Sequence, residues 1–381
     1  MIKKLLLTPG PIELTPAVRQ SLVANSIGHL SPTFTTTFQN ALNNTKRLFK
    51  TTNGQPIIIS GSGTLGWDLF GSNVVNRNDS ILLISTGFFS DSFASCLTGY
   101  GAKVDKLDAI PGHIVPLKTI QEKLQKNNYK AVVMTQVDTS TAVLNDVQGI
   151  SQLVKEFSPN SFVVVDGVCS IGCEVFEFDN WNIDYCLTAS QKAIGAPPGL
   201  SISMVSPRLL KYVMNERDTT DQVTSFYLSF KKWLPIMESC IQGKPSYFAT
   251  PPVQLILSLD VALKELLDAT PRGLDERIEK SSKTSDWFKQ QLTKELGLKM
   301  IPQDPQYTAH GLTTIYVENP ADLIKFLADN GVFIAGPMLK SIPPYARVGH
   351  MGVSAWDNDN NQHITRCYEL LREYCTTKSK V

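Results

Sequence analysis

The sequence predicts an α/β protein with a seven-stranded, mostly parallel sheet in a large domain and a small α+β domain after it. Short runs rich in valine and isoleucine recur with helical stretches between them, which is typical of a doubly wound sheet covered on both faces. A chain of 381 residues is also long enough to bury a large core, and its length favours two domains.

The predicted strands of the sheet lie at residues 57–60, 81–85, 103–107, 131–136, 162–167, 185–190 and 200–206. The link before the last strand contains Gly195-Ala196-Pro197-Pro198-Gly199, which is too short and too broken for a crossover helix. The seventh strand should therefore run antiparallel to its neighbour. Residues 207–252 are expected to be irregular, because many aromatic residues and several prolines interrupt any periodic pattern.

The second half of the chain begins with helical spacing of apolar residues from residue 253, over a length that could bridge two domains. The segments predicted beyond it are a helix near 275–296, strands near 312–317, 332–336 and 345–349, and a final helix near 359–375. These elements predict the smaller α+β domain.

The composition excludes several classes of protein. Hydrophobic residues make up 42% and charged residues 19%, as in an ordinary soluble globular enzyme. Thirty-six basic and 35 acidic side chains leave no net field to hold nucleic acid or an anionic membrane. No apolar run approaches the ~18 residues of a spanning helix, and Thr8-Pro9-Gly10-Pro11 interrupts the start too early for a signal peptide. Seven scattered cysteines, an odd number, indicate reduced thiols in an intracellular protein.

Two charged residues follow predicted strands that are neighbours along the chain. Asp166 ends the run that begins at Phe162, and Lys192 follows the strand that ends at Ser190. Adjacent parallel strands would bring both side chains to the same edge of the sheet, where α/β proteins place their ligands. A carboxylate for a ring nitrogen and a lysine for a Schiff base are what pyridoxal phosphate requires. The alternative is that Asp166 is a helix cap and Lys192 a surface lysine.

A glycine-rich segment, Gly61-Ser62-Gly63-Thr64-Leu65-Gly66, lies between a predicted strand and a predicted helix. Its amides and the helix N-terminus would form an anion site. The same segment matches the dinucleotide pattern G-x-G-x-x-G, which needs an acidic residue about 20 residues further on. The next strand ends Ile84-Ser85-Thr86-Gly87 without a carboxylate, so phosphate binding remains and NAD is excluded. The alternative is a glycine turn that only caps the helix.

Three further segments offer candidate contacts, each with a structural alternative. A ring of Phe88 or Phe89 could stack on a flat heterocycle, although two adjacent aromatics are often core residues. Hydroxyls near Thr139 could meet a phenolic oxygen, although Asp138-Thr139-Ser140-Thr141 also suits an Asx turn. Arg347 could bind a carboxylate as a planar fork, whereas its local pattern favours an exposed edge residue.

Metal and serine chemistry find no support in the sequence. Cys169 and Cys173 are spaced i, i+4, but no further cysteine or histidine pair completes a metal site, so buried thiols are expected. The five histidines form no zinc motif, and no G-x-S-x-G elbow occurs.

With these residues in place, the chain resembles the class V aminotransferase family of fold-type-I pyridoxal-phosphate enzymes. The resemblance runs nearly end to end, and the segments that carry it are Leu6-Leu7-Thr8-Pro9-Gly10-Pro11, Ser60-Gly61-Ser62-Gly63-Thr64, Val165-Asp166, Ser190-Gln191-Lys192-Ala193, Ala196-Pro197-Pro198-Gly199, Tyr247 with Thr250-Pro251, and Arg347-Val348-Gly349. It implies transfer of an amino group from L-alanine to glyoxylate, which gives pyruvate and glycine. It also implies an N-terminal arm over the active site at 1–20, a large cofactor-binding domain at 21–260 and a small C-terminal domain at 261–381.

The resemblance also implies a role for each matched residue. Lys192 would form the Schiff base and shuttle a proton, and Asp166 would keep the pyridine nitrogen protonated. The phosphate would be held by a set of polar groups from two subunits of a homodimer with shared active sites: Ser62, Gly63, Thr64 and Gln191 from one subunit, Tyr247 and Thr250 from its neighbour. Arg347 would bind the substrate carboxylate, and Gly10 would crowd the amino-acid side chain.

Some positions depart from the family pattern. Phe89 falls where relatives carry a stacking tryptophan, Thr139 where they carry a serine near the ring, and Thr64 where some carry histidine. These departures weaken the stacking assignment of Phe89 without removing it.

Other functions stay open at this level. Serine–pyruvate or serine–glyoxylate transamination is hard to separate, since alanine and serine differ by one hydroxyl. A cysteine desulfurase would place histidine before the lysine, where this chain has Gln191. A non-catalytic α/β subunit would have no need for both Lys192 and Asp166. The ending Ser379-Lys380-Val381 approaches a peroxisomal signal but has valine last, so the cytosol is favoured, with mitochondria or peroxisomes as alternatives.

Overall fold

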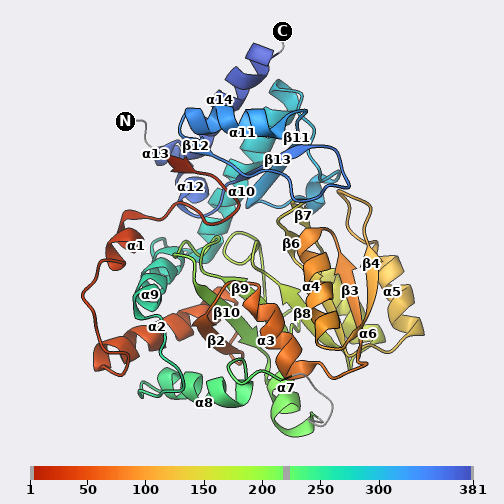
Figure 1. Cartoon of the computed structure of the whole chain (residues 1–381), viewed down its shortest axis with the longest axis vertical. Helices are drawn as coiled ribbons and strands as arrows, with labels where there is room; N and C mark the ends of the chain where they lie inside the picture. Colours follow the sequence, from red (N-terminus) through yellow and green to blue (C-terminus); the bar gives the residue numbers. More distant parts are fainter. Residues whose placement is uncertain (1–3, 218–223, 379–381) are drawn as a thin grey trace.

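The computed structural model of the chain describes residues 4–217 and 224–378. Figure 1 shows a sheet with its helices in the lower part of the molecule, and a smaller group of elements above it, into which the N-terminal strand also runs. The ending Ser379-Lys380-Val381, on which the targeting expectation depends, lies outside the described residues.

The central sheet has seven strands, as predicted. In chain order they are β2 (Gln55–Ser60), β3 (Ser80–Ser85), β4 (Lys103–Asp108), β5 (Ala131–Thr135), β8 (Phe162–Asp166), β9 (Tyr185–Ala189) and β10 (Leu200–Val205). Their order across the sheet is β2-β10-β9-β8-β5-β3-β4. Strand β10 pairs antiparallel with both of its neighbours, and the pairs from β9 to β4 are parallel. The antiparallel seventh strand is therefore confirmed.

Helices cover both faces of this sheet. The crossovers through α3 (Leu65–Val74) and α4 (Phe88–Gly99) run along the sheet in one direction, and those through α5 (Leu117–Lys126) and α6 (Val147–Phe157) run in the other. Because crossovers are right-handed, the two pairs of helices lie on opposite faces. Strands covered on both sides must be apolar throughout, and every residue of β5, β8, β9 and β10 is buried.

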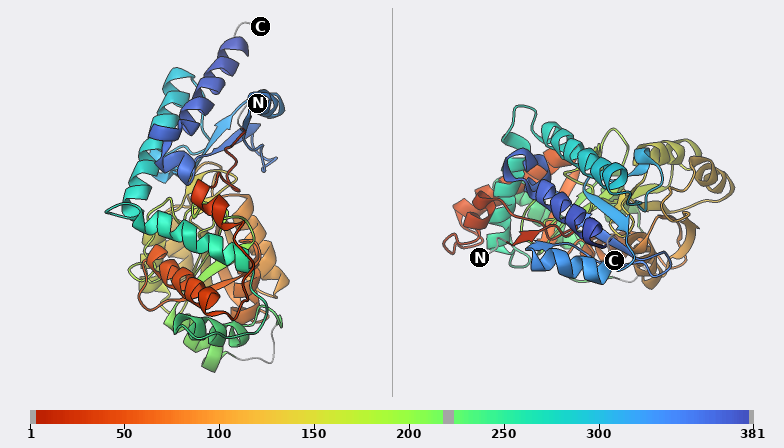
Figure 2. Two further views of the ribbon diagram at one scale, coloured as in Figure 1. Left: turned by 90° about the vertical axis from the view of Figure 1, so that its left-hand side faces the viewer. Right: turned by 90° about the horizontal axis from the view of Figure 1, so that it is seen from above.

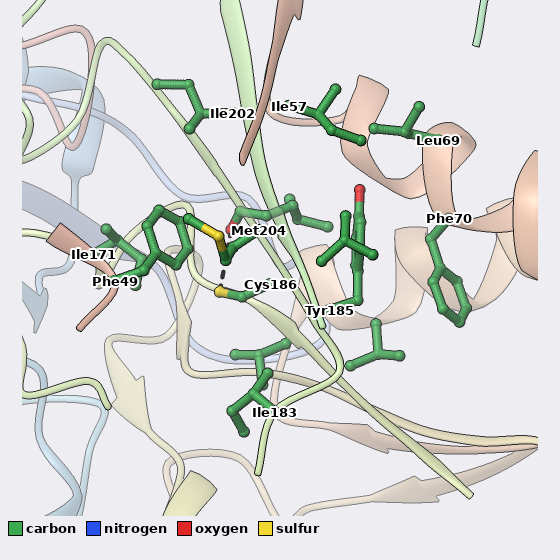
Figure 3. Close-up of a cluster of buried hydrophobic side chains, with 14 of the residues drawn as sticks. Phe49, Ile57, Leu69, Phe70, Ile171, Ile183, Tyr185, Cys186, Ile202 and Met204 are labelled. Atoms are coloured by element: carbon green, nitrogen blue, oxygen red, sulfur yellow. Dashed lines mark hydrogen bonds between the residues drawn. The ribbon is translucent and has the colours of Figure 1, made fainter. Parts of the chain in front are cut away.

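Figure 3 shows buried side chains packed on both faces of the sheet around β9 and β10. Tyr185 of β9 is fully buried there beside Phe70 of α3, with ring centroids 5.4 Å apart. Its hydroxyl donates to the carbonyl of Gly66 at 2.8 Å, so the buried polar atom is satisfied.

A second group of helices packs beside β2. It contains α1 (Pro16–Ser21), α2 (Pro32–Leu48), α8 (Phe230–Ile241) and α9 (Val253–Asp268), and Figures 1 and 2 show α2 and α9 lying side by side. The helix predicted from residue 253 is confirmed as α9. Between β10 and α8 lie α7 (Pro207–Lys211) and a π-helical turn, η1 (Tyr212–Glu216).

The expectation of irregular structure across 207–252 was wrong for α8. This helix contains Pro235, which lacks a backbone donor and therefore removes one helical hydrogen bond. Pro235 lies on the exposed side, where water can reach the carbonyl left without its partner. The opposite side buries Phe230, Trp233, Leu234, Met237 and Cys240, at helical spacing, and this burial outweighs the interruption.

The C-terminal elements form a smaller layered unit. It consists of α10 (Leu274–Gln290), η2 (Gln291–Glu295), η3 (Pro305–Tyr307), β11 (Leu312–Tyr316), α11 (Pro320–Asp329), β12 (Val332–Phe333), β13 (Tyr345–Gly349), α12 (Val353–Trp356), α13 (Asn358–Asn361) and α14 (His363–Lys378). Strand β13 pairs antiparallel with β11. Strand β12 is shorter than the predicted 332–336, and it pairs in parallel with β1 (Leu5–Leu6), a long-range contact that local pattern does not reveal.

Buried apolar residues form separate clusters. The largest surrounds the central sheet, and another joins Leu5 and Leu7 to the C-terminal elements, including Phe288 and Val348. The predicted domain boundaries at residues 20 and 260 stay a prediction.

A short ribbon, β6 (Val137–Asp138) with β7 (Val143–Leu144), leaves the sheet after β5. Within the described ranges, no helix combines the length and apolar character needed to cross a bilayer.

Candidate active site

The candidate site lies at the carboxyl edge of the sheet, between β8 and β9. These strands are parallel neighbours, so Asp166 at the end of β8 and Lys192 just after β9 reach the same edge. Lys192 is 8% exposed and Asp166 4%, which excludes the alternative of a surface lysine. The structure therefore brings together the two residues that the strand ends predicted.

The Asp166 carboxylate is held by two hydrogen bonds. The indole Nε1 of Trp67 donates to Oδ2 at 2.7 Å, and the backbone amide of Val168 donates to Oδ1 at 2.9 Å. Burial raises the pKa of Asp166 to about 6 against the effect of both donors, and the nearby charge of Asp138 adds to the rise. Because burial disfavours the ionised carboxylate, a cationic group beside Asp166 would be stabilising.

The Lys192 amine lies under the N-terminal segment. Its Nζ donates to the carbonyl of Pro9, and burial lowers its pKa. The positive charge of Arg347 acts on it in the same direction. An amine with a lowered pKa is more often neutral and therefore nucleophilic.

Gly10 crosses directly over the lysine side chain. Its φ is +97°, and a Cβ atom at this position would lie 2.4 Å from Cδ of Lys192. Both the backbone conformation and the available space thus require glycine. Strand β1 ties the segment to the C-terminal unit, which places this part of the chain over the site.

The glycine-rich segment 61–64 connects β2 to α3, as the anion-site interpretation requires. Among the described residues, the backbone amides of Ser62, Gly63 and Thr64 donate to no other protein group, and the Thr64 side chain does not cap the helix. A Cβ on Gly63 would lie 2.6 Å from Val168, so the segment lies against the residues that follow Asp166. Helix α3 continues from these free amides, and a helix-capping turn and an anion site are both compatible with this geometry.

Gln191, the residue before Lys192, presents an amide without partners. Its Oε1 atom is buried and makes no hydrogen bond with any described group. This oxygen can accept a hydrogen bond, and the Nε2 of the same side chain can donate one.

The region around residue 139 forms the predicted Asx turn and also lies beside the candidate site. The Asp138 carboxylate accepts from the amide of Ser140 at 3.0 Å, which is the Asx turn, and from the amides of Phe89 and Ser90 at the start of α4. Thr139 is buried beside the site, and its carbonyl accepts from Arg347.

The two phenylalanines after β3 differ in exposure. Phe88 is 40% exposed, whereas Phe89 is partly buried and packs against the main core. Their rings meet edge-on, with centroids 5.4 Å apart.

Arg347 lies on β13, opposite Thr314 of β11. The locally favoured interpretation, an exposed edge residue, was wrong, because the side chain is half-buried and its neighbours tie it in place. Its Nε donates to the carbonyl of Gly336 at 2.7 Å, and Nη1 donates to the carbonyl of Thr139 at 3.3 Å. Burial lowers its pKa, yet a guanidinium stays charged at any physiological pH.

Tyr247 and Thr250 are not brought to Lys192 within a single chain. Tyr247 is 55% exposed, and its hydroxyl lies 3.3 Å from the Thr250 hydroxyl. Both hydroxyls are thus presented outward, on the surface of the chain.

Sequence reasoning missed Trp67 and the Pro9 carbonyl. Trp67 directly follows the glycine-rich segment 61–66, which could have indicated a contact at the same sheet edge. Cys169 and Cys173 are buried free thiols, as expected, and no metal-binding group of acidic, cysteine and histidine residues occurs in the described ranges.

Comparisons with known proteins agree with this geometry. The family profile described as aminotransferase class-V matches residues 18–339. The chain is 50% identical over 376 residues to alanine–glyoxylate aminotransferase 1 of Saccharomyces cerevisiae, covering 96% of both chains. It is 26% identical to serine–glyoxylate aminotransferase of Arabidopsis thaliana, over 82% of this chain and 75% of the relative. Among solved structures, alanine–glyoxylate aminotransferase from Nostoc sp. superposes with a TM-score of 0.87 at 23% identity, covering 97% of this chain and 96% of that one.

Proposed function

This chain belongs to the class-V aminotransferase family, and on that premise we propose that it transfers the amino group of L-alanine to glyoxylate, giving pyruvate and glycine. The observation that carries the reaction type is the pairing of Lys192 and Asp166 at adjacent strand ends. The choice of substrates is supported by the 50% identity to the yeast alanine–glyoxylate enzyme.

Enzymes of this family and fold type use pyridoxal phosphate, and the residues present fit it. The free backbone amides at 62–64 suit its phosphate, to which Nε2 of Gln191 would add a donor, and the buried carboxylate of Asp166 suits its ring nitrogen. When bound, this cofactor supplies an electron sink for the bond-breaking step at the amino-acid Cα.

Lys192 would hold the cofactor and then move a proton at the substrate Cα. Its burial favours the neutral amine that both tasks require. Asp166 would keep a proton on the ring nitrogen by charge pairing in a dry environment. Phe89 would stack on the ring, and Thr139 would offer a hydroxyl at its edge.

Arg347 would hold the carboxylate that amino acid and oxo acid share. Two of its nitrogens are fixed by the carbonyls of Gly336 and Thr139, so the guanidinium is oriented before substrate arrives. Gly10, which already touches the Lys192 stem, would limit the space for the substrate side chain and favour small amino acids.

We further propose a homodimer in which Tyr247 and Thr250 complete the neighbouring subunit's phosphate site. Leu30, Phe226 and Tyr247 are exposed, and their neighbours are also aromatic or apolar: the ring of Tyr247 contacts His29, and that of Phe226 contacts Phe248. Phe226 is 74% exposed, and an apolar patch of this kind is typical of a subunit interface.

Serine is the second candidate donor, because one relative is the serine–glyoxylate aminotransferase of Arabidopsis and a site for alanine discriminates weakly against one added hydroxyl.

We also expect the protein in the cytosol, with mitochondria or peroxisomes as alternatives. A fluorescent fusion that leaves the C-terminus free would decide between them.

A half-reaction screen tests the proposal. The purified protein, saturated with pyridoxal phosphate, is mixed with single amino acids, and the loss of visible absorbance and the oxo acid formed are followed. L-alanine should react fastest and yield pyruvate. Borohydride should attach the cofactor to Lys192, as located by peptide mass spectrometry, whereas Lys192→Ala should bind the cofactor loosely without turnover. Near-normal turnover of that variant, or reaction with serine but not alanine, would contradict the proposal.

A further inference from the structure

Trp67 joins helix α3 to the carboxylate at the end of β8. Its Nε1 lies 2.7 Å from Oδ2 of Asp166, and both side chains are buried, at 6% and 4% exposure. A hydrogen bond to an ionised group in a dry environment is among the stronger contacts in a protein. No other side chain in the described ranges donates to this carboxylate.

The indole is fixed from three directions. Gly66 allows α3 to approach β9 closely, because a Cβ there would lie 2.7 Å from Leu187. The indole stacks on Phe93 of α4, with centroids 5.4 Å apart and planes inclined by 14°. Asp68, the next residue, accepts from the hydroxyl of Tyr100 at 3.0 Å and so ties α3 to α4. The donor is therefore rigid and does not need to be ordered when a ligand arrives.

We propose that Trp67 is a positioning residue for Asp166: its indole N–H orients the carboxylate and favours the ionised form that meets the ring nitrogen. This inference rests on the proposed function, in which Asp166 is the partner of that nitrogen. One rigid helix then serves both ends of the cofactor, because the amides at 62–64 precede α3 and Trp67 lies within its first turn.

Replacing the indole by a phenyl ring separates these roles. Trp67→Phe keeps an aromatic ring beside Phe93 but removes the donor, so Asp166 would retain only the amide of Val168. Losing one hydrogen bond to a charged group should raise the pKa of Asp166 by about one to two units. A loss of packing alone would leave this pKa unchanged.

The experiment is a carboxyl titration by NMR with ¹³C-labelled aspartate in the cofactor-free protein. Asp166→Asn identifies the signal by its loss. The matched control is Trp233→Phe. Trp233 lies in α8, is also buried, and its indole donates to the carbonyl of Tyr227 at 2.5 Å. We expect the Asp166 titration to shift upward in Trp67→Phe and to stay in place in Trp233→Phe.

A second measurement uses the intact indole, in case Trp67→Phe does not fold. With 5-fluorotryptophan incorporated at the five tryptophans, one ¹⁹F signal should follow the titration of Asp166 and lose that titration in Asp166→Asn. In the enzyme loaded with cofactor, Trp67→Phe should lower kcat and leave KM for L-alanine nearly unchanged, because the substrate carboxylate is bound elsewhere.

The outcomes are distinct. A folded Trp67→Phe protein with an unshifted Asp166 titration, or five ¹⁹F signals that ignore Asp166, overturns the inference. If the titration shifts but the protein binds no pyridoxal phosphate, the proposed function fails while the coupling between Trp67 and Asp166 stands.

Discussion

Arg347 offers the sharpest test of how the site would recognise its substrates. Its Nε and Nη1 are tied to backbone carbonyls, whereas Nη2 has no protein partner in the described ranges. The guanidinium can therefore offer two parallel donors to a carboxylate without first being ordered. We consider the change Arg347→Ala, with Arg347→Lys as the variant that keeps the charge.

The expected loss can be worked out from these contacts. Two charge-assisted hydrogen bonds at about 1.5–3 kcal/mol each amount to about 3–6 kcal/mol. This corresponds to a fall of about 10²- to 10⁴-fold in kcat/KM. Arg347→Lys should recover only part of it, because an ammonium is a point charge without the planar fork.

The assay compares L-alanine with L-alaninamide, which lacks the carboxylate. The unmodified protein should prefer L-alanine by a large factor, and Arg347→Ala should lose most of this preference while retaining cofactor. Arg208→Lys is the matched control, since Arg208 also donates to a backbone carbonyl, that of Pro159 at 2.7 Å, but lies outside the site. If Arg347→Ala loses cofactor yet keeps its preference for L-alanine, Arg347 is structural and another cation binds the substrate.

Three further predictions concern the partner hydroxyls and two buried ionisable groups. Tyr247→Phe should weaken retention of pyridoxal phosphate by about 1–3 kcal/mol, as measured by equilibrium dialysis, and unchanged retention, or a fully active monomer in sedimentation, would refute the shared site. Without cofactor, burial raises the pKa of Asp166 from 3.8 to about 6, so the folded protein binds more protons than the unfolded chain in this window. Asp166 should therefore lower the free energy of unfolding by about 3 kcal/mol as pH rises through this window, and urea titrations of Asp166→Asn should show a fall that is smaller by that amount. Burial lowers the pKa of Lys289 from 10.5 to about 8, so the sign reverses: stability should rise with pH between these values, and a rise that persists in Lys289→Met would exclude Lys289 as its source.

Several features of the fold follow from sequence pattern because they depend on local chemistry. Runs such as Ile57-Ile58-Ile59 cannot be exposed on either side, so a sheet covered on both faces was predictable. The broken link at 195–199 allowed only an antiparallel return for β10, as observed. The meeting of Asp166 and Lys192 was predictable for the same reason, since parallel strands align their carboxyl ends.

Other features depend on residues distant in the chain, and local pattern predicted them wrongly or not at all. The pairing of β1 with β12 joins residues 5–6 to 332–333, which no periodicity connects. Arg347 resembled an edge residue because its enclosing carbonyls, those of Gly336 and Thr139, are supplied by other segments. Helix α8 lies in a segment whose aromatic residues and prolines hid its pattern, and its apolar side is stabilised by a surface that other segments supply.

The sequence by itself therefore determined the class of the sheet, the ends of its strands and the chemistry collected at one edge. Those properties depend on side-chain polarity and backbone preference at each position, which a sequence states directly. Only the tertiary structure decided that Trp67 donates to Asp166, that Gly10 crosses over Lys192 and that Arg347 donates to the carbonyls of Gly336 and Thr139. Each of these depends on how closely two separate elements approach, a distance set by packing across the whole core rather than by any one segment.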